Sequence, residues 1–160
     1  MMKLLRLLEE NSRLSTEQLA TLTGMSPEEV AGEIDRYERE GIIRSYGAII
    51  DWEKTERNYV SALIELKVSP KRDYGFEEIA KTIMEFPEVE TVYLMSGGYD
   101  LALTVSGESF RDIAMFVAHR LSPLDSVLST ATHFVLRRYK ERGVVICSED
   151  DNDEREVTML

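Results

Sequence analysis

The first third of the chain contains three stretches in which apolar residues recur at the three-to-four-residue spacing of an amphipathic helix. They lie at residues 2–10, 15–24 and 26–41. The second and third stretches each open with a capping box, a hydroxyl residue followed three positions later by Glu or Gln. The pairs are Ser15 with Gln18 and Ser26 with Glu29. Gly24 and Gly41 then stand where helices commonly end. The pattern predicts three short helices.

The period changes to that of a strand after Gly41. Residues 42–51 alternate and are rich in β-branched side chains, which predicts a short hairpin-like wing. Two capped helices joined by a tight turn, followed by a wing, are typical of a winged helix-turn-helix, and we assign it residues 1–50. A plain three-helix bundle is the alternative at this point.

The second half of the chain mixes strand and helix patterns. Residues 51–58 are polar and charged and are predicted to be a linker. Beyond them we expect strands at 59–68, 89–96, 99–106 and 126–139, with helices at 74–86 and 109–121. This β-α-β-β-α-β order predicts a ferredoxin-like domain over 59–143, and an α+β protein as a whole. One face of such a sheet is covered by its helices, so the other face needs a partner.

The negative net charge of the chain disfavours nucleic acid as a partner. The formal net charge is −11, and DNA binding depends largely on Lys and Arg that neutralise phosphates. Residues 1–57 carry a net −4, residues 58–143 a net −2 and residues 144–160 a net −5. Nearly half of the excess therefore lies in the last segment, for which we expect a short strand at 143–147 and an acidic tail. No segment is strongly basic.

Several classes of protein are disfavoured by residues that the chain lacks. Cys147 is its single cysteine, which excludes a disulfide framework and a cysteine-based zinc cluster. The two histidines, His119 and His133, are too far apart to indicate a metal site. The apolar N-terminal run is interrupted by Lys3 and Arg6, so we expect no signal peptide, no membrane span and a cytoplasmic location. Without a phosphate-binding loop or a nucleophile elbow, we expect no catalytic residues and no cofactor.

Three stretches of the chain resemble the Lrp/AsnC (feast/famine) transcription regulators. They are RLSTEQLATLTGMSPEEVAGEIDRYEREGIIRSYGAIID, VYLMSGGYDLALTV and LDSVLSTATHFVLRRYK, and the resemblance covers residues 2–142. It implies a DNA-binding winged helix-turn-helix and a second domain that pairs through its sheet into homodimers, which often assemble into octamers. It also implies a small effector, commonly an amino acid, bound near the G-x-Y-D loop.

The third helix is where DNA contacts are expected, yet it is strongly acidic. At 100° per residue, Val30, Ile34 and Tyr37 form its core face, and the outward face is mixed. A carboxylate there can accept a hydrogen bond from the amine of cytosine. The candidate DNA-binding residues are Arg13, Ser26, Glu28, Arg36, Arg39 and Arg44. These are few cations for the family, so we expect weak binding per subunit; the alternative is a helix-turn-helix that no longer reads DNA.

The G-x-Y-D loop is the candidate effector site. Gly97 and Gly98 permit positive φ and expose backbone N–H groups that can hold a carboxylate, while Asp100 could meet an ammonium group. The full candidate set is Met95, Gly97, Gly98, Tyr99, Asp100, Thr130 and Thr132. An ordinary hairpin turn, and for the threonines ordinary strand positions, are the plainer interpretations.

A different function on the same architecture stays open. Some proteins of similar architecture are haem-precursor decarboxylases that do not bind DNA, and others would serve as sensors alone. Such an enzyme needs a cationic pocket for tetrapyrrole carboxylates. The arginines available for it are Arg111, Arg120, Arg137 and Arg138.

Overall fold

The computed structural model describes residues 2–69 and 75–146. The chain divides after Ile49 into two compact units. We call the first the helix-turn-helix unit and the second the ferredoxin-like unit, and each is described by itself. Within the described residues, no helix has both the length and the apolar character needed to cross a membrane.

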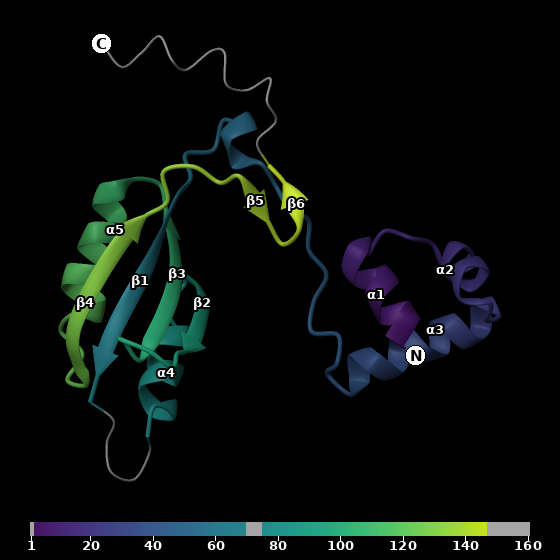
Figure 1. Ribbon diagram of the computed structural model, residues 1–160, viewed down its shortest axis with the longest axis horizontal. Coiled ribbons are helices and arrows are strands. Elements are labelled where there is room, and N and C mark those ends of the chain that lie inside the picture. The colour runs from purple at the N-terminus through teal and green to yellow at the C-terminus, as the bar shows by residue number, and fades with distance from the viewer. Residues whose placement is uncertain (1, 70–74, 147–160) are drawn as a thin grey trace. The chain divides into compact units, whose positions relative to one another are not determined.

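The helix-turn-helix unit consists of the three expected helices (Figure 1). They are α1 (Met2–Glu10), α2 (Thr16–Thr23) and α3 (Pro27–Arg39). Its core contains the buried side chains of Leu4, Leu8, Leu19, Ala20, Val30 and Tyr37. The apolar spacing of residues 15–24 predicts an inward Leu22, but this side chain is 45% exposed in the structure. The inward stripe of α2 runs through Leu19, Ala20 and Thr23, which leaves Leu22 on its edge.

Both predicted capping boxes are confirmed. The Gln18 backbone N–H donates to Ser15 Oγ at 3.2 Å, and the Ser15 N–H donates to Gln18 Oε1 at 2.8 Å. Ser26 and Glu29 make the same two bonds at 3.2 and 2.8 Å. These bonds satisfy N–H groups that a helix leaves unpaired at its first turn. They explain why α3 begins one residue after Ser26, with the turn of Gly24 behind it.

The predicted wing is wrong. Residues 42–51 contain no strand, although the Tyr46 hydroxyl donates to Glu38 Oε1 at 2.8 Å and so ties this segment to α3. Alternation along a sequence favours an extended backbone, but a strand also requires a second segment for its hydrogen bonds. No such segment lies beside these residues among the described part of the unit.

The ferredoxin-like unit has the expected βαββαβ order. After a short 3-10 turn, η1 (Trp52–Lys54), its elements are β1 (Val60–Val68), α4 (Glu77–Met84), β2 (Val89–Leu94), β3 (Leu101–Gly107), α5 (Phe110–Phe116), a π-helical continuation η2 (Val117–Leu121) and β4 (Val127–Phe134). The strands form one antiparallel sheet in the order β2-β3-β1-β4. A small hairpin of β5 (Lys140–Glu141) and β6 (Val144–Val145) follows.

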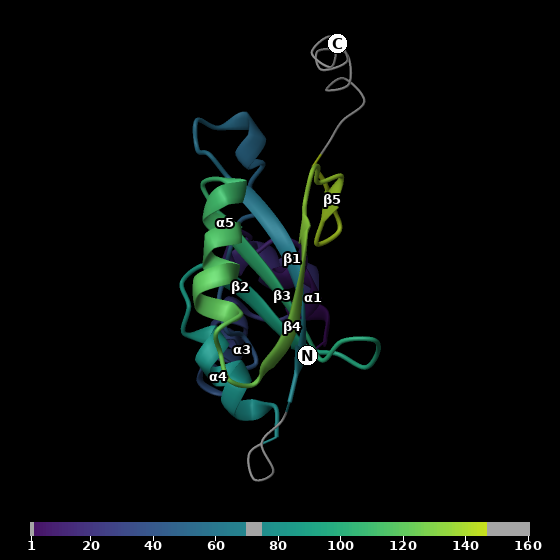
Figure 2. The ribbon, with the colours of Figure 1, turned by 90° about the vertical axis from the view of Figure 1, so that its left-hand side faces the viewer.

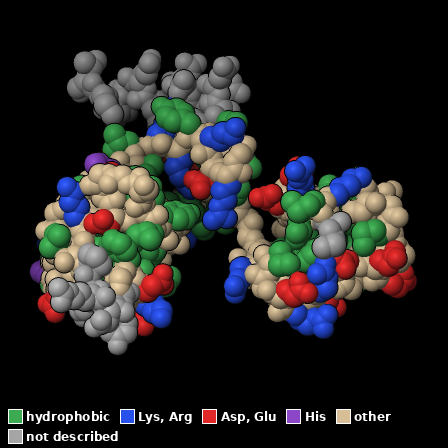
Figure 3. Space-filling view, turned by 60° about the horizontal axis from the view of Figure 1, so that its bottom comes forward, with side chains coloured by type: hydrophobic (Ala, Val, Ile, Leu, Met, Phe, Trp, Pro, Cys, Tyr) green, Lys and Arg blue, Asp and Glu red, His purple; other side chains and the backbone are tan. Residues whose placement is uncertain are grey.

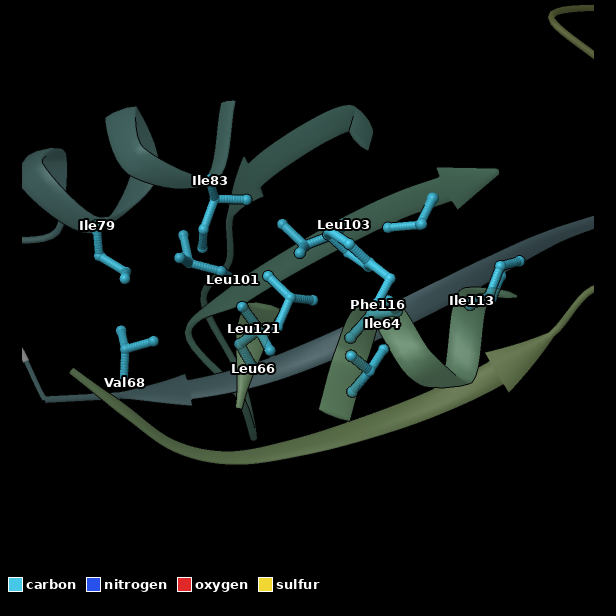
Figure 4. Packing of buried hydrophobic residues seen from close by; sticks show 13 residues of the cluster. Ile64, Leu66, Val68, Ile79, Ile83, Leu101, Leu103, Ile113, Phe116 and Leu121 are labelled. Atoms are coloured by element: carbon cyan, nitrogen blue, oxygen red, sulfur yellow. The ribbon is translucent and has the colours of Figure 1, made fainter. Parts of the chain in front are cut away.

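The helices cover one face of this sheet, as Figure 2 shows. Ile64 and Leu66 of β1 and Leu101 and Leu103 of β3 point to that side and are at most 1% exposed. They meet inward residues of the two helical segments (Figure 4). On these helices the apolar spacing predicts an inward face, and its residues Ile79, Ile83, Ile113, Phe116, Val117 and Leu121 are buried, whereas Phe76 and Phe86 are only partly buried. The opposite face carries no helix and exposes Leu63 and Tyr93.

Several elements are shorter than predicted. The helix predicted from Tyr74 begins at Glu77, and Tyr74 itself lies outside the described residues. The strand predicted to reach Tyr139 ends at Phe134, where its ladder with β1 stops at the pair of Ala62 and Phe134. Of the strand predicted at 143–147, only Val144–Val145 forms one. Cys147 and the acidic tail lie outside the described residues.

Candidate functional site

The outward face of α3 is mixed in charge, as expected. Val30 and Tyr37 are buried and Ile34 is half-buried, so the opposite side of the helix faces solvent. The side chains exposed along it are Glu28, Ala31, Asp35 and Arg39, with Gly32 between them. Ala31 was not among the candidate residues. Its spacing of three from Glu28 and four from Asp35 is the sequence signal that places it there.

Arg36 is less available than the sequence indicated. Its Nη2 lies 2.6 Å from Glu33 Oε2 and its Nη1 lies 3.1 Å from Glu40 Oε2. The guanidinium also lies 4.8 Å from the centre of the Tyr37 ring, and the side chain is only 31% exposed. The hydrogen bond to Arg36 lowers the pKa of Glu33 below its ordinary value, and the same bond raises the pKa of Arg36. Both groups therefore stay charged, and they neutralise each other.

Four of the six carboxylates in residues 26–41 have partners in the structure. Glu29 caps α3, Glu38 accepts from Tyr46, and Glu33 and Glu40 hold Arg36. Among the described residues, the carboxylates of Glu28 and Asp35 have none. Asp35 and Arg39 stand four residues apart, a spacing that favours an ion pair, but Arg39 Nε instead donates to the Asp35 backbone carbonyl at 3.3 Å.

The remaining candidate cations lie around α3 without forming a broad basic surface. Arg13 is exposed in the turn before α2. Arg44 folds back over the end of α3, where its Cζ lies 3.1 Å from the position that a Cβ would occupy on Gly41. Figure 3 shows acidic and basic side chains interspersed on the visible face of this unit.

In the ferredoxin-like unit, the G-x-Y-D loop joins β2 to β3 and projects from the sheet on the side away from the helices (Figure 2). The Met95 N–H donates to the Asp100 carbonyl at 2.8 Å and closes the loop. The Val68 N–H at the end of β1 donates to Asp100 Oδ2 at 2.9 Å, and the Asp100 N–H donates to the Leu66 carbonyl at 2.9 Å. Asp100 therefore fastens the loop to the central strand, across the bulge that follows Lys67.

Gly97 and Gly98 form the open end of this loop. Neither adopts the positive φ that glycine permits, and a Cβ on either would meet no atom within 4 Å. Among the described residues, no group accepts a hydrogen bond from their backbone N–H groups. Met95 is 40% exposed beside them, and Tyr99 is half-buried. The loop thus offers two free donors next to one carboxylate.

Thr130 and Thr132 lie elsewhere on the sheet. They stand opposite Leu66 and Ile64 of β1, which puts their side chains on the helix-covered face at the β4 edge. Since β1 separates β4 from β3, the threonines and the loop do not form one site within a single ferredoxin-like unit. Their contact with an effector stays a prediction.

Two of the four arginines considered for a tetrapyrrole pocket, Arg120 and Arg138, make contacts within the unit. Arg120 Nη1 lies 2.7 Å from Glu88 Oε1, and its guanidinium lies 4.3 Å from the centre of the Phe86 ring. The Arg138 guanidinium lies 5.2 Å from the centre of the Tyr59 ring. In the part of the chain that the structure describes, no three metal-ligating side chains converge.

Comparison with known proteins adds family membership to this geometry. Residues 2–38 match the AsnC-type helix-turn-helix domain, and residues 61–145 match the Lrp/AsnC ligand binding domain. The HTH-type transcriptional regulator YugG of Bacillus subtilis is 48% identical over 151 residues, which cover 94% of this chain and 91% of that protein. A proline dehydrogenase transcriptional activator of Rhizobium radiobacter is 29% identical over 143 residues, covering 89% of this chain and 91% of the activator.

Solved structures of regulators from this family have the same fold. A transcriptional regulator from Neisseria meningitidis in complex with L-Met superposes with a TM-score of 0.71 at 26% identity, covering 87% of this chain and 89% of that one. Bacillus subtilis LrpC superposes with a TM-score of 0.65 at 25% identity, covering 87% and 94%. The two domain matches together span most of the chain. The relatives named above are regulators of transcription. The chain belongs to the Lrp/AsnC family of DNA-binding transcriptional regulators.

Proposed function

We propose that this regulator recognises specific duplex sequences through α3 as a homodimer or larger assembly. We further propose that an amino acid bound at the G-x-Y-D loop controls this recognition. The observation that carries the proposal is the pairing of free Gly97 and Gly98 N–H groups with the Asp100 carboxylate on one short loop. An α-amino acid presents the complementary pair, a carboxylate and an ammonium group.

The loop is suited to both ends of such a ligand. Backbone N–H groups without an internal acceptor can donate to an anion, so the ligand carboxylate is expected at Gly97 and Gly98. The Val68 N–H occupies only one oxygen of Asp100, which leaves Oδ1 for the ammonium group. Met95 and Tyr99 stand beside the loop and would contact the side chain of the amino acid. The L-Met complex of the Neisseria relative supports this class of ligand.

A conservative substitution separates the binding role of Asp100 from its structural one. Asp100→Asn keeps a carbonyl oxygen for the Val68 N–H but removes the negative charge that attracts an ammonium group. We expect the wild-type protein to bind at least one member of an amino-acid mixture in calorimetric titration, and the variant to bind it at least tenfold more weakly. Asp125→Asn, an exposed change of the same charge in the same unit, is the matched control.

The same preparations test control of DNA binding. Selection from a pool of random duplexes, with and without the bound amino acid, should enrich one sequence whose affinity changes with the ligand. Equal amino-acid affinity in wild type and Asp100→Asn would remove the loop as the effector site. A selection that enriches no sequence under either condition would argue against sequence-specific DNA binding altogether.

A further inference from the structure

We infer that Glu28 and Asp35 determine the sequence preference of this regulator, and that each carboxylate reads a cytosine in the major groove of the operator. The inference rests on the proposed sequence-specific DNA binding and adds the chemical class of base that α3 selects. It assigns a role to the acidic residues that otherwise make this helix a poor ligand for a polyanion.

The geometry of α3 selects these two carboxylates from the six available. The exposed stripe defined by Glu28, Ala31, Gly32, Asp35 and Arg39 follows helical spacing along a single face. That stripe lies opposite the buried side of the helix. In a helix-turn-helix, the residues toward the N-terminus of the second helix contact base edges. The N-terminal half of the stripe therefore contains the Glu28 carboxylate, one methyl group and one position without a side chain, and Asp35 follows less than one turn beyond Gly32.

The other carboxylates of α3, and Arg36, already have partners. The Glu29 carboxylate is bonded to the Ser26 N–H at 2.8 Å, and Arg36 lies between two glutamates at 2.6 and 3.1 Å. To contact a base, Arg36 would have to leave both of these partners. Glu28 and Asp35 have no side-chain partner among the described residues, so they can meet a base without breaking a bond.

The hydrogen-bonding code of the major groove then restricts the bases. An ionised carboxylate only accepts hydrogen bonds. Cytosine presents its N4 amine, a donor, whereas guanine and thymine present acceptors that a carboxylate repels. Adenine presents a donor beside the N7 acceptor, which makes it a poorer partner for a carboxylate than for an amide. Cytosine is therefore the base that both residues favour.

Two features of the stripe allow the close approach that this contact needs. A Cβ added to Gly32 would meet no atom within 4 Å, so the backbone there can come near a base edge without an obstacle. The Ala31 methyl group is the kind of apolar contact that favours the methyl group of thymine. Arg39, at the C-terminal end of the stripe, supplies a cation for a phosphate.

The test is selection from a random duplex pool with the full-length wild type, Glu28→Gln and Asp35→Asn. An amide pairs with adenine through N6 and N7, so each variant should replace one selected cytosine by adenine. The ratio of affinities for the two bases should change by roughly 5- to 150-fold at that position. Both residues are exposed, so neither change disturbs the core. Glu10→Gln removes the same charge from α1 and should leave the selected sequence unchanged.

The outcomes separate this inference from the proposed function. If wild type enriches a sequence and both variants enrich the same one, the regulator reads DNA by other residues and the inference is wrong. A rise in affinity with every variant, Glu10→Gln included, without a change of base shows only relief of charge repulsion and also overturns it. If wild type enriches no sequence, the proposed function fails together with the inference.

Discussion

Arg36 and Arg39 stand three residues apart on α3, yet the structure gives them different roles. Arg36 is neutralised by two glutamates, whereas Arg39 is exposed and only its Nε is bonded, to a backbone carbonyl. Phosphate contacts need a cation that is free to approach. At the residue scale we therefore expect Arg39 to contact DNA and Arg36 to remain paired with the two glutamates of its own helix.

The first prediction compares the two arginines directly. Arg39→Gln should weaken DNA binding by roughly tenfold, about 1.4 kcal/mol, as expected for a lost charge-assisted contact. Changing Glu33, Arg36 and Glu40 to Gln together removes the whole cluster and adds one unit of positive charge, so affinity should hold or rise. Fluorescence anisotropy with the selected duplex measures both. A large loss in the triple variant would show that Arg36 reaches DNA after all.

At the scale of the element, Gly41 ends α3 and sets the direction of the chain that leaves it. It adopts φ 67°, and the Ile42 N–H donates to the Tyr37 carbonyl at 2.8 Å while the Gly41 N–H donates to the Glu38 carbonyl at 3.0 Å. These two bonds form a Schellman motif, which satisfies carbonyls that the last turn leaves unpaired. A side chain at Gly41 would also press against the Arg44 guanidinium.

The second prediction follows from this conformation. Gly41→Ala should lower the free energy of unfolding of the helix-turn-helix unit by about 1–2 kcal/mol, because an L-residue is disfavoured in the left-handed region. Thermal denaturation monitored by circular dichroism at 222 nm measures the change. Gly47→Ala is the control, since Gly47 has no positive φ and open space around it. Equal shifts for both variants would contradict the assignment.

The elements that could be predicted from sequence are those whose causes are local. Ser15 and Ser26 each accept a hydrogen bond from the backbone N–H three residues further on. The local sequence is therefore enough to predict where these two helices begin. The wing could not be predicted in this way, because a strand depends on a distant segment for its hydrogen bonds. The end of β4 at Phe134 also depends on a distant segment, since the strand stops where its ladder with β1 stops, at Ala62.

The sequence predicted which segments form the candidate sites. It did not predict which partners their side chains contact. The loop at Met95–Asp100 lies where the motif placed it, but the bond from Asp100 to Val68 joins residues 32 positions apart. Likewise, the spacing of 100° per residue puts Arg36 on the outward side of α3. That spacing alone does not show that Glu33 and Glu40 bind its guanidinium. Spacing along a helix or strand gives the face of a residue, and rotamers decide which partner it finds.

At the scale of the whole molecule, we expect the face of the sheet that carries no helix to pack against a second copy of the chain. Leu63 lies at the centre of that face on β1 and is 39% exposed, and Tyr93 on β2 is 59% exposed. Exposed apolar side chains on a sheet without a covering layer are typical of an interface. Two copies related by a twofold axis can cover both faces at once.

The third prediction tests this pairing. Leu63→Lys places a charge in the expected interface and should convert dimers or larger species to monomers, because an unpaired buried charge is strongly unfavourable. Sedimentation equilibrium measures the mass. Met84→Lys introduces the same side chain at an exposed position of α4, on the helical side, and should leave the mass unchanged. A monomeric wild type, or a Leu63→Lys protein that keeps the wild-type mass, would exclude the sheet face as the interface.

Assembly into a dimer would also increase the number of cations that this acidic protein presents to DNA. In the helix-turn-helix unit, Arg13, Arg39 and Arg44 lie around α3 and have no carboxylate partner among the described residues, in contrast to Arg36. With two units on one duplex, about six phosphates can be neutralised, and the logarithm of the affinity should fall with the logarithm of salt concentration with a slope of about −5. Each further dimer engaged would steepen it.

The fourth prediction uses that slope to count contacts. Binding isotherms of the selected duplex between 50 and 200 mM salt, concentrations chosen for the experiment, give the slope for wild type. Arg39→Gln should reduce its magnitude by about 2 in a dimer, since one phosphate contact is lost from each subunit. Glu28→Gln should leave the slope nearly unchanged while it alters the selected base, because a base contact releases no counterion. A slope that stays constant on loss of Arg39 would mean that the phosphates are held by cations outside α3, and the acidic helix would then enter the groove with its carboxylates alone.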